Sequence, residues 1–147
     1  LLSMSIFVFY VIILKLKLNR AELDLIKNKS KKMTSEKFEI EINTLKSFFE
    51  VYCKDKHENQ ENRNVTLEYK NKTFEIELCL CKECQDAINY SFDRLLQCPH
   101  EIKPRCRKCP TPCYEKPRWK NVAKVMIHSA VKLSLSKMKS RVKNIFS

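Results

Sequence analysis

Glycine is absent from this chain of 147 residues. An average protein has roughly 7% glycine. The phosphate-binding loops of Rossmann and P-loop proteins need it, because a Cβ atom would keep the backbone away from the phosphate. The absence therefore argues against a nucleotide-dependent enzyme of either kind. No uninterrupted hydrophobic run reaches the roughly 20 residues that a membrane-spanning helix needs.

Acidic residues are scarce at both ends of the chain. The chain has 29 Lys and Arg against 17 Asp and Glu, a formal net charge of +12. Residues 1–32 contribute +5 and residues 116–147, which have nine bases and no acid, contribute +9, which leaves −2 for residues 33–115. The basic excess is thus a property of the ends, and by itself it is a weak argument for nucleic-acid binding.

The first 14 residues, Leu1 to Leu14, are almost entirely apolar, and three bases follow within the next six positions. The run has no basic segment before it and no small-residue cleavage site after it, so it is a poor signal peptide. We interpret residues 1–32 either as sequence upstream of a true start at Met33 or as a short signal anchor; a core segment is the third option. In the first two cases residues 33–147 form a single domain in the cytoplasm, which contacts a membrane only if residues 1–14 are translated.

Hydrophobic spacing predicts a mainly α-helical domain. Apolar residues recur every three or four positions at about 35–55, at about 83–97 and from Trp119 to Leu133, and a short basic helix is expected over 134–147. Two alternating segments flank Lys70-Asn71-Lys72 and predict a β-hairpin, with Asn71 in a turn conformation that usually requires glycine. The expected fold is therefore a small domain of three to four helices, a short hairpin and Cys-rich, metal-binding loops.

Cysteine is concentrated in one part of the chain. Seven of the eight cysteines lie between Cys79 and Cys113. Because no secretion signal is present, this density indicates metal–thiolate chemistry rather than a disulfide framework. Cys84 is expected at a helix N-terminus, where the helix dipole favours the thiolate form that binds metal.

The spacing of the cysteines predicts two metal sites. A straight helix from Cys84 to Cys98 separates its ends by about 20 Å, so these two residues cannot bind the same ion. The first predicted set is Cys53, His57, Cys81 and Cys84, with Cys79 outside it, and the second is Cys98, Cys106, Cys109 and Cys113. The alternative is one zinc ribbon that combines Cys81-x2-Cys84 with Cys106-x2-Cys109, although their 21-residue gap is slightly longer than the usual range of about 15 to 20.

Four-ligand sites rich in cysteine bind zinc or iron–sulfur clusters, and the sequence leaves the choice between them open. The metals could also have a purely structural role, as ions that stabilise a small core. No Ser/His/Asp set or pair of carboxylates indicates catalysis, so we do not expect an enzyme. A thiol redox protein that uses Cys106 and Cys109 is a further alternative.

Several of these motifs also occur together in one protein family. They are Tyr52-Cys53 with His57, Cys81-Lys-Glu-Cys84, the segment Tyr90 to Pro99, and the segment Lys103 to Tyr114. From Phe49 to about Lys139 the chain resembles the small bacterial, YgbA-like proteins of the nitrous oxide-stimulated promoter family. It departs from the family in having a single histidine after the first cysteine and Ala130-Val131 where a Gly-Pro pair is usual.

The resemblance implies a role in nitrosative stress, because the family name refers to genes that are switched on under that stress. We therefore expect a cytoplasmic metal-binding accessory protein that acts in the response to nitric oxide, with a protein partner that the sequence does not identify. The alternative is a zinc-stabilised regulator that binds nucleic acid through Arg118, Lys120, Lys124 and the basic C-terminus. A basic amphipathic helix of this kind is more often a solvated face or a membrane-surface contact.

Overall fold

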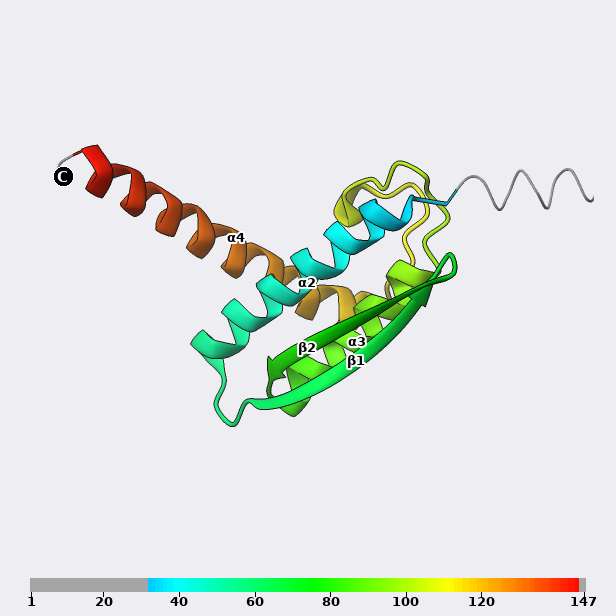
Figure 1. Cartoon of the computed structure of the whole chain (residues 1–147), viewed down its shortest axis with the longest axis horizontal. Coiled ribbons are helices and arrows are strands. Elements are labelled where there is room, and N and C mark those ends of the chain that lie inside the picture. The colour runs from blue at the N-terminus through cyan, green and yellow to red at the C-terminus, as the bar shows by residue number, and fades with distance from the viewer. Residues whose placement is uncertain (1–31, 146–147) are drawn as a thin grey trace, which may run out of the picture. The chain divides into compact units, whose positions relative to one another are not determined.

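The structure is a computed structural model that describes residues 32–145 (Figure 1). The expectation for the apolar run at residues 1–14 lies outside the described residues, and the predicted domain boundary at Met33 stays a prediction. The chain divides into two compact units, of which the larger comprises residues 34–98 and 104–147. All the helices and strands below belong to this unit, whereas residues 99–103 belong to the smaller unit together with Met33.

Helix α2 (Ser35–Lys56) begins at a polar cap and buries one face. The side chain of Thr34 accepts a hydrogen bond from the backbone N–H of Lys37 at 3.2 Å, which satisfies one of the free amides at the helix start. Phe38, Ile42, Phe49 and Cys53 are its buried residues. Their spacing of four, seven and four positions keeps them on one side of the helix, as the sequence predicted.

A two-stranded antiparallel sheet follows, made of β1 (Glu61–Tyr69) and β2 (Lys72–Leu80). The two turn residues, Lys70 and Asn71, both have positive φ, at 48° and 63°. This is the backbone of a type I′ turn, which matches the twist of the strands that it joins. Burial alternates along β2, so that its inward residues Ile76, Leu78 and Leu80 cover the helices while the residues between them face solvent.

Two further helices complete the larger unit. Helix α3 (Lys82–Leu96) begins directly after β2, with Cys81 as its N-cap, and helix α4 (Lys116–Ile145) runs to the end of the described chain. The segment between them has one short 3-10 turn, η1 (Cys106–Lys108). Proline at four positions of this segment, 99, 104, 110 and 112, explains why it forms no longer helix.

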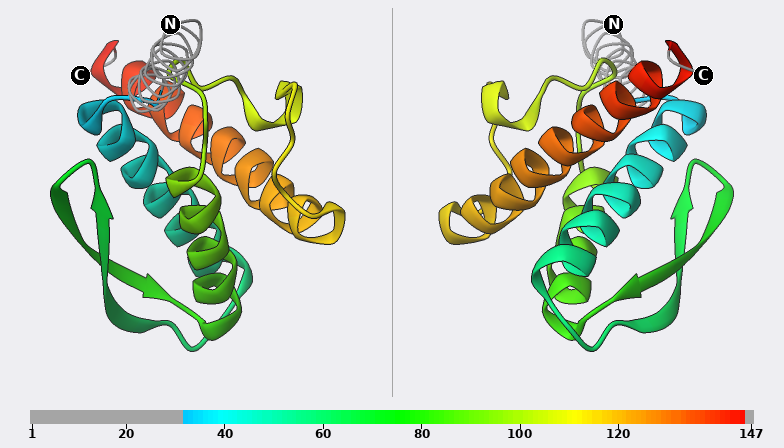
Figure 2. Two further views of the ribbon diagram at one scale, coloured as in Figure 1. Left: turned by 90° about the vertical axis from the view of Figure 1, so that its right-hand side faces the viewer. Right: turned by 90° about the vertical axis from the view of Figure 1, so that its left-hand side faces the viewer.

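The elements form three layers in which α2 and α3 are the middle one (Figures 1 and 2). Strand β2 packs on one side of this pair and α4 crosses the other side. The aromatic ring of Phe38 stacks on that of Tyr69, with centroids 4.1 Å apart and planes 8° apart. The hairpin is therefore held to α2 by aromatic packing near its turn, while β2 leads the chain directly into α3.

The predicted fold class is confirmed, with three helices, a hairpin and Cys-rich loops. The predicted break between a third and a fourth helix is wrong, because one helix of 30 residues covers both. Neither Gly nor Pro lies between 118 and 145 to interrupt it. The buried face of α4 also differs from the predicted stripe, since Val122, Val125 and Ser129 are buried whereas Ala130 is exposed.

Candidate metal centre

The first predicted set of ligands comes together in space. The Sγ atoms of Cys53, Cys81 and Cys84 and a ring nitrogen of His57 all lie within 4.8 Å of one another. These residues come from the end of α2, the residue after it, and the first turn of α3 with its N-cap. Among the described residues this is the one group of three or more possible ligands that is so compact. The group can therefore hold a metal ion.

Two distances define how His57 enters the group. Its Nδ1 atom lies 3.2 Å from the Sγ of Cys84 and 3.3 Å from the Sγ of Cys81. In a tetrahedral zinc site, the Zn–S distance is about 2.3 Å and the Zn–N distance about 2.0 Å. A sulfur ligand and a nitrogen ligand on the same ion, which form one edge of the tetrahedron, are then about 3.5 Å apart. The observed separations are close to that edge. His57 thus presents Nδ1 to the thiols in the arrangement of one tetrahedral ion.

The end of helix α2 accounts for the position of His57. The helix ends at Lys56, and His57 is its extended C-cap, whose N–H donates to the carbonyl oxygen of Cys53 at 2.9 Å. The sequence argument assumed that the helix continued through His57. Because α2 ends before His57, the backbone of His57 is extended and not helical. Its hydrogen bond to the carbonyl oxygen of Cys53 nevertheless keeps His57 one turn away from Cys53 and on the same side of the helix.

The side chain of Gln60 fastens this turn. Its Nε2 atom donates to the carbonyl oxygens of Cys53 and His57, at 3.0 and 2.8 Å, and lies 3.6 Å from the Sγ of Cys53. Asn59 makes the return possible, with φ of 59°. The sequence analysis missed Gln60, because a glutamine in a polar loop carries no signal that it will fold back on the preceding helix.

Electrostatics within the group favour a bound cation. Burial raises the pKa of the Cys84 thiol, and the neighbouring Cys53 and Cys81 raise it further. Three crowded thiolates repel one another unless a positive ion compensates them, and a metal reverses the preference because it binds only the deprotonated form. The backbone N–H of Cys81 donates to the Sγ of Cys53 at 3.2 Å, which stabilises negative charge on that sulfur.

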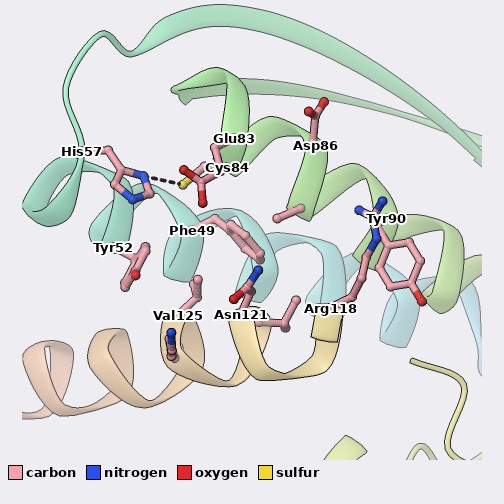
Figure 3. A pocket seen from close by; sticks show the side chains of 13 residues that line it. Phe49, Tyr52, His57, Glu83, Cys84, Asp86, Tyr90, Arg118, Asn121 and Val125 are labelled. Carbon is pink, nitrogen blue, oxygen red and sulfur yellow. Dashed lines mark hydrogen bonds between the residues drawn. The ribbon is translucent and has the colours of Figure 1, made fainter. Parts of the chain in front are cut away.

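A cavity of about 250 Å³ adjoins the group, between α2, α3 and α4 (Figure 3). Its lining includes His57 and Cys84 at one end and Tyr90 and Arg118 at the other, as the close view shows. A small molecule that enters it can therefore approach the edge of the group that His57 and Cys84 form.

Cys79 stays outside the group, as predicted. It lies on the exposed face of β2, where its backbone N–H donates to the side chain of Glu50 at 3.3 Å. The alternative zinc ribbon is not the arrangement found, since Cys81 and Cys84 have Cys53 and His57 as their neighbours.

The second predicted set lies around the segment between α3 and α4. Cys98 follows the C-cap of α3, Cys106 begins η1, and Cys109 closes that turn with an N–H···O bond of 3.3 Å to Cys106. Burial raises the pKa of the Cys113 thiol, and the charges of Cys106 and Cys98 raise it further. The four cysteines are thus neighbours, although their sulfur atoms are not as close together as in the first set. A second metal at these four residues stays a prediction.

Aromatic packing holds the end of this segment, at Tyr114, against helices α3 and α4. Tyr114 contacts Tyr90 and Trp119 edge-on, at centroid distances of 5.5 and 5.4 Å, and burial raises its pKa to about 12. The guanidinium of Arg94 lies over Tyr90, at 5.3 Å from the ring centroid, and its charge lowers the pKa of Cys113. Its Nε atom is buried without a hydrogen-bond partner. Arg94 therefore supplies positive charge beside the second set of cysteines.

Comparison with known proteins supports the resemblance seen in the sequence. The profile of the family described as nitrous oxide-stimulated promoter matches residues 36–146, which is most of the chain. The chain belongs to this family. No curated protein and no solved structure shows significant similarity to it. The match includes all eight predicted metal ligands, so both sets lie within the part of the chain that the family shares. Within the described residues, no helix has both the length and the apolar character needed to cross a membrane.

Proposed function

We propose that this protein is a metal-binding accessory protein of the cytoplasm that acts in the response to nitric oxide and has no classical turnover. The observation that carries the proposal is the convergence of Cys53, His57, Cys81 and Cys84 from separate elements to within 4.8 Å. The description of the family supplies the link to nitrogen oxides. The adjoining cavity supports it, because a small molecule can reach the Cys84 thiol there.

The geometry favours a single zinc ion at the first set. Three sulfurs and one imidazole nitrogen form a common ligand set of structural zinc sites. In an iron–sulfur cluster the protein ligands are distributed over two or more irons with bridging sulfides between them, so at least some pairs of ligand atoms are farther apart than the edge of one tetrahedron. Ligand atoms within 4.8 Å of one another match one ion better than a cluster. For the second set, zinc and iron–sulfur remain equal options.

Metal analysis of anaerobically purified protein tests the proposal. We expect zinc in the wild-type protein, a loss of about one equivalent in the Cys84→Ser variant, and no loss in the matched Cys79→Ser variant, because Cys79 lies outside the group. A brown protein would identify an iron–sulfur cluster. A folded wild-type protein that binds no metal would contradict the proposal.

The physiological half of the proposal needs its own test. Cells that carry the Cys84→Ser or the double Cys106→Ser, Cys109→Ser chain should grow more slowly under a nitric oxide donor than cells with the Cys79→Ser chain. Normal growth of both variant strains would show that the thiols have no part in this response, even if the metal is present.

A further inference from the structure

Helix α4 carries a second apolar stripe that no other described helix or strand covers. Its buried face is made of Val122, Val125 and Ser129, which contact the rest of the larger unit. Four large apolar residues elsewhere on the helix are instead exposed: Ile127 at 68%, Val131 at 56%, Leu135 at 52% and Met138 at 61%. At 100° per residue, these four lie within an arc of about 80° on the opposite side of the helix.

Basic residues flank this stripe on both sides. On the helical wheel, Lys139 lies on one side of it, and Lys137 and Arg141 lie on the other, each roughly 80 to 120° from its centre. Lys132, on the same side as Lys139, is instead paired with Asp55 of α2. The side chains of Lys137, Lys139 and Arg141 are exposed. No acidic residue occurs from 116 to 147 to neutralise them. An apolar stripe between two rows of bases is the pattern of a helix that lies in the interface of a membrane.

The shape of the helix leaves the stripe accessible. Helix α4 has 30 residues, which corresponds to about 45 Å. Its C-terminal half projects beyond α2, as the orange-to-red end of the ribbon shows in Figure 1. The stripe therefore does not have to displace another described element in order to meet a flat surface.

We propose that the α4 stripe, defined as Ile127, Val131, Leu135 and Met138, binds the surface of an anionic membrane. The apolar residues enter the boundary between headgroups and acyl chains, and the flanking bases pair with the lipid phosphates. The helix lies on the membrane and does not cross it. This contact is separate from the candidate metal centre and from the proposed function.

The other possible occupants fit the chemistry less well. A second copy of the chain, packed stripe to stripe, would bring two rows of like charges together, which opposes association. Nucleic acid would use the bases, but phosphate binding has no need of four exposed aliphatic side chains in line. Only an anionic lipid surface uses both the charge and the stripe.

Co-sedimentation of the full-length chain with vesicles tests the proposal. We expect binding to vesicles of equal parts phosphatidylcholine and phosphatidylglycerol that is at least about tenfold tighter than to phosphatidylcholine alone. The Val131→Ser, Leu135→Ser, Met138→Ser variant should bind at least about tenfold more weakly. The control is Ile40→Ser with Ile102→Ser, because these side chains are also exposed, at 58% and 90%, but lie outside α4. Circular dichroism checks that both variants remain folded.

A second variant separates the contribution of charge. Lys137→Gln, Lys139→Gln and Arg141→Gln together should remove most of the preference for anionic vesicles, because each base near the surface contributes to it. The proposal is overturned if the stripe variant binds vesicles as well as the wild-type protein does, since lipid affinity would then come from another segment such as residues 1–14. It is equally overturned if the protein binds duplex DNA but no vesicles, or if it forms a dimer that the stripe substitutions dissociate.

Discussion

The imidazole of His128 on α4 is hydrogen-bonded to the carboxylate of Asp55 in the last turn of α2, with 2.8 Å between Nε2 and Oδ2. Lys132, one turn farther along α4, pairs with the other oxygen of the same carboxylate. Nearby, the hydroxyl of Ser129 donates to the carbonyl oxygen of Phe48 at 2.6 Å. Since Asp55 lies between Cys53 and His57, α4 is fastened to the turn that carries half of the candidate metal centre.

This contact predicts a pH-dependent loss of stability in the Asp55→Asn variant. Lys132 and His128 lower the pKa of Asp55, so the folded state favours the ionised carboxylate more than the unfolded state does. The stabilisation is therefore fully present above the unfolded pKa of about 3.9 and is lost as the pH falls through the lower folded value. The variant should unfold at a lower temperature than the wild-type protein at about pH 7, and the difference should shrink progressively as the pH falls below about 4.

The control for this experiment is Asp93→Asn, an exposed aspartate on α3. It removes the same charge without touching the contact between α2 and α4, and should leave the unfolding temperature nearly unchanged. If the Asp55→Asn difference persists undiminished at low pH, the ion pair is not its cause.

Removal of metal should destabilise the fold. The four first-set ligands join α2 to α3, and binding free energy at such a site is also folding free energy. Treatment of the zinc-loaded protein with a strong chelator should therefore lower the free energy of unfolding by an amount on the order of several kcal/mol. Denaturant unfolding before and after chelation measures the change.

The matched variants make that result specific. Cys84→Ser should have a small response to the chelator, because its first site is already impaired, while Cys79→Ser should respond as the wild-type protein does. An equal chelator effect in all three proteins would assign the stabilising metal to the second set or to another site.

The sequence could predict the first ligand set because its constraints are local. Cys53 and His57 are one helical turn apart, and Cys81 and Cys84 bracket a helix start, so two pairs were recognisable. Their convergence follows from the hairpin, which returns the chain to α2. The second set lies in a proline-rich segment without regular structure, where spacing gives no geometry, and its arrangement could not be predicted in the same way.

Other features of the structure depend on tertiary contacts, and no local sequence pattern indicates them. The link between Asp55 and His128 joins residues that are 73 positions apart. The apolar residues of α4 form two stripes on different faces, and such a change of face predicts two helices, whereas the structure has one. A single long helix that buries one apolar stripe and exposes another has the same spacing of apolar residues as two successive helices.

The hairpin turn offers a prediction about stability. A residue with a Cβ atom is unfavourable at positive φ, and type I′ turns prefer Asn or Gly at both central positions. Lys70 has φ of 48°. Replacing it with glycine should raise the free energy of unfolding by up to about 1 kcal/mol. Asn71→Gly should give a smaller gain, because asparagine already tolerates this conformation. Urea unfolding of both variants checks the order, and a loss of stability in Lys70→Gly would show that contacts of the lysine side chain outweigh its backbone strain.

Gln60 is predicted to increase metal affinity indirectly, because it stabilises the turn that carries Cys53 and His57. Its side-chain amide donates to the carbonyl oxygens of Cys53 and His57, so it holds two ligands in position without binding the ion. Loss of such a supporting contact typically weakens metal affinity by about 10- to 100-fold. We expect Gln60→Ala to weaken zinc binding by that amount in competition with a chromophoric chelator, and Gln97→Ala, an exposed glutamine at the far end of α3, to leave it unchanged. Because a merely destabilised fold would also lower affinity, the zinc stoichiometry at saturation should be measured as well. It should remain that of the wild-type protein in Gln60→Ala, whereas a ligand substitution such as Cys84→Ser should reduce it.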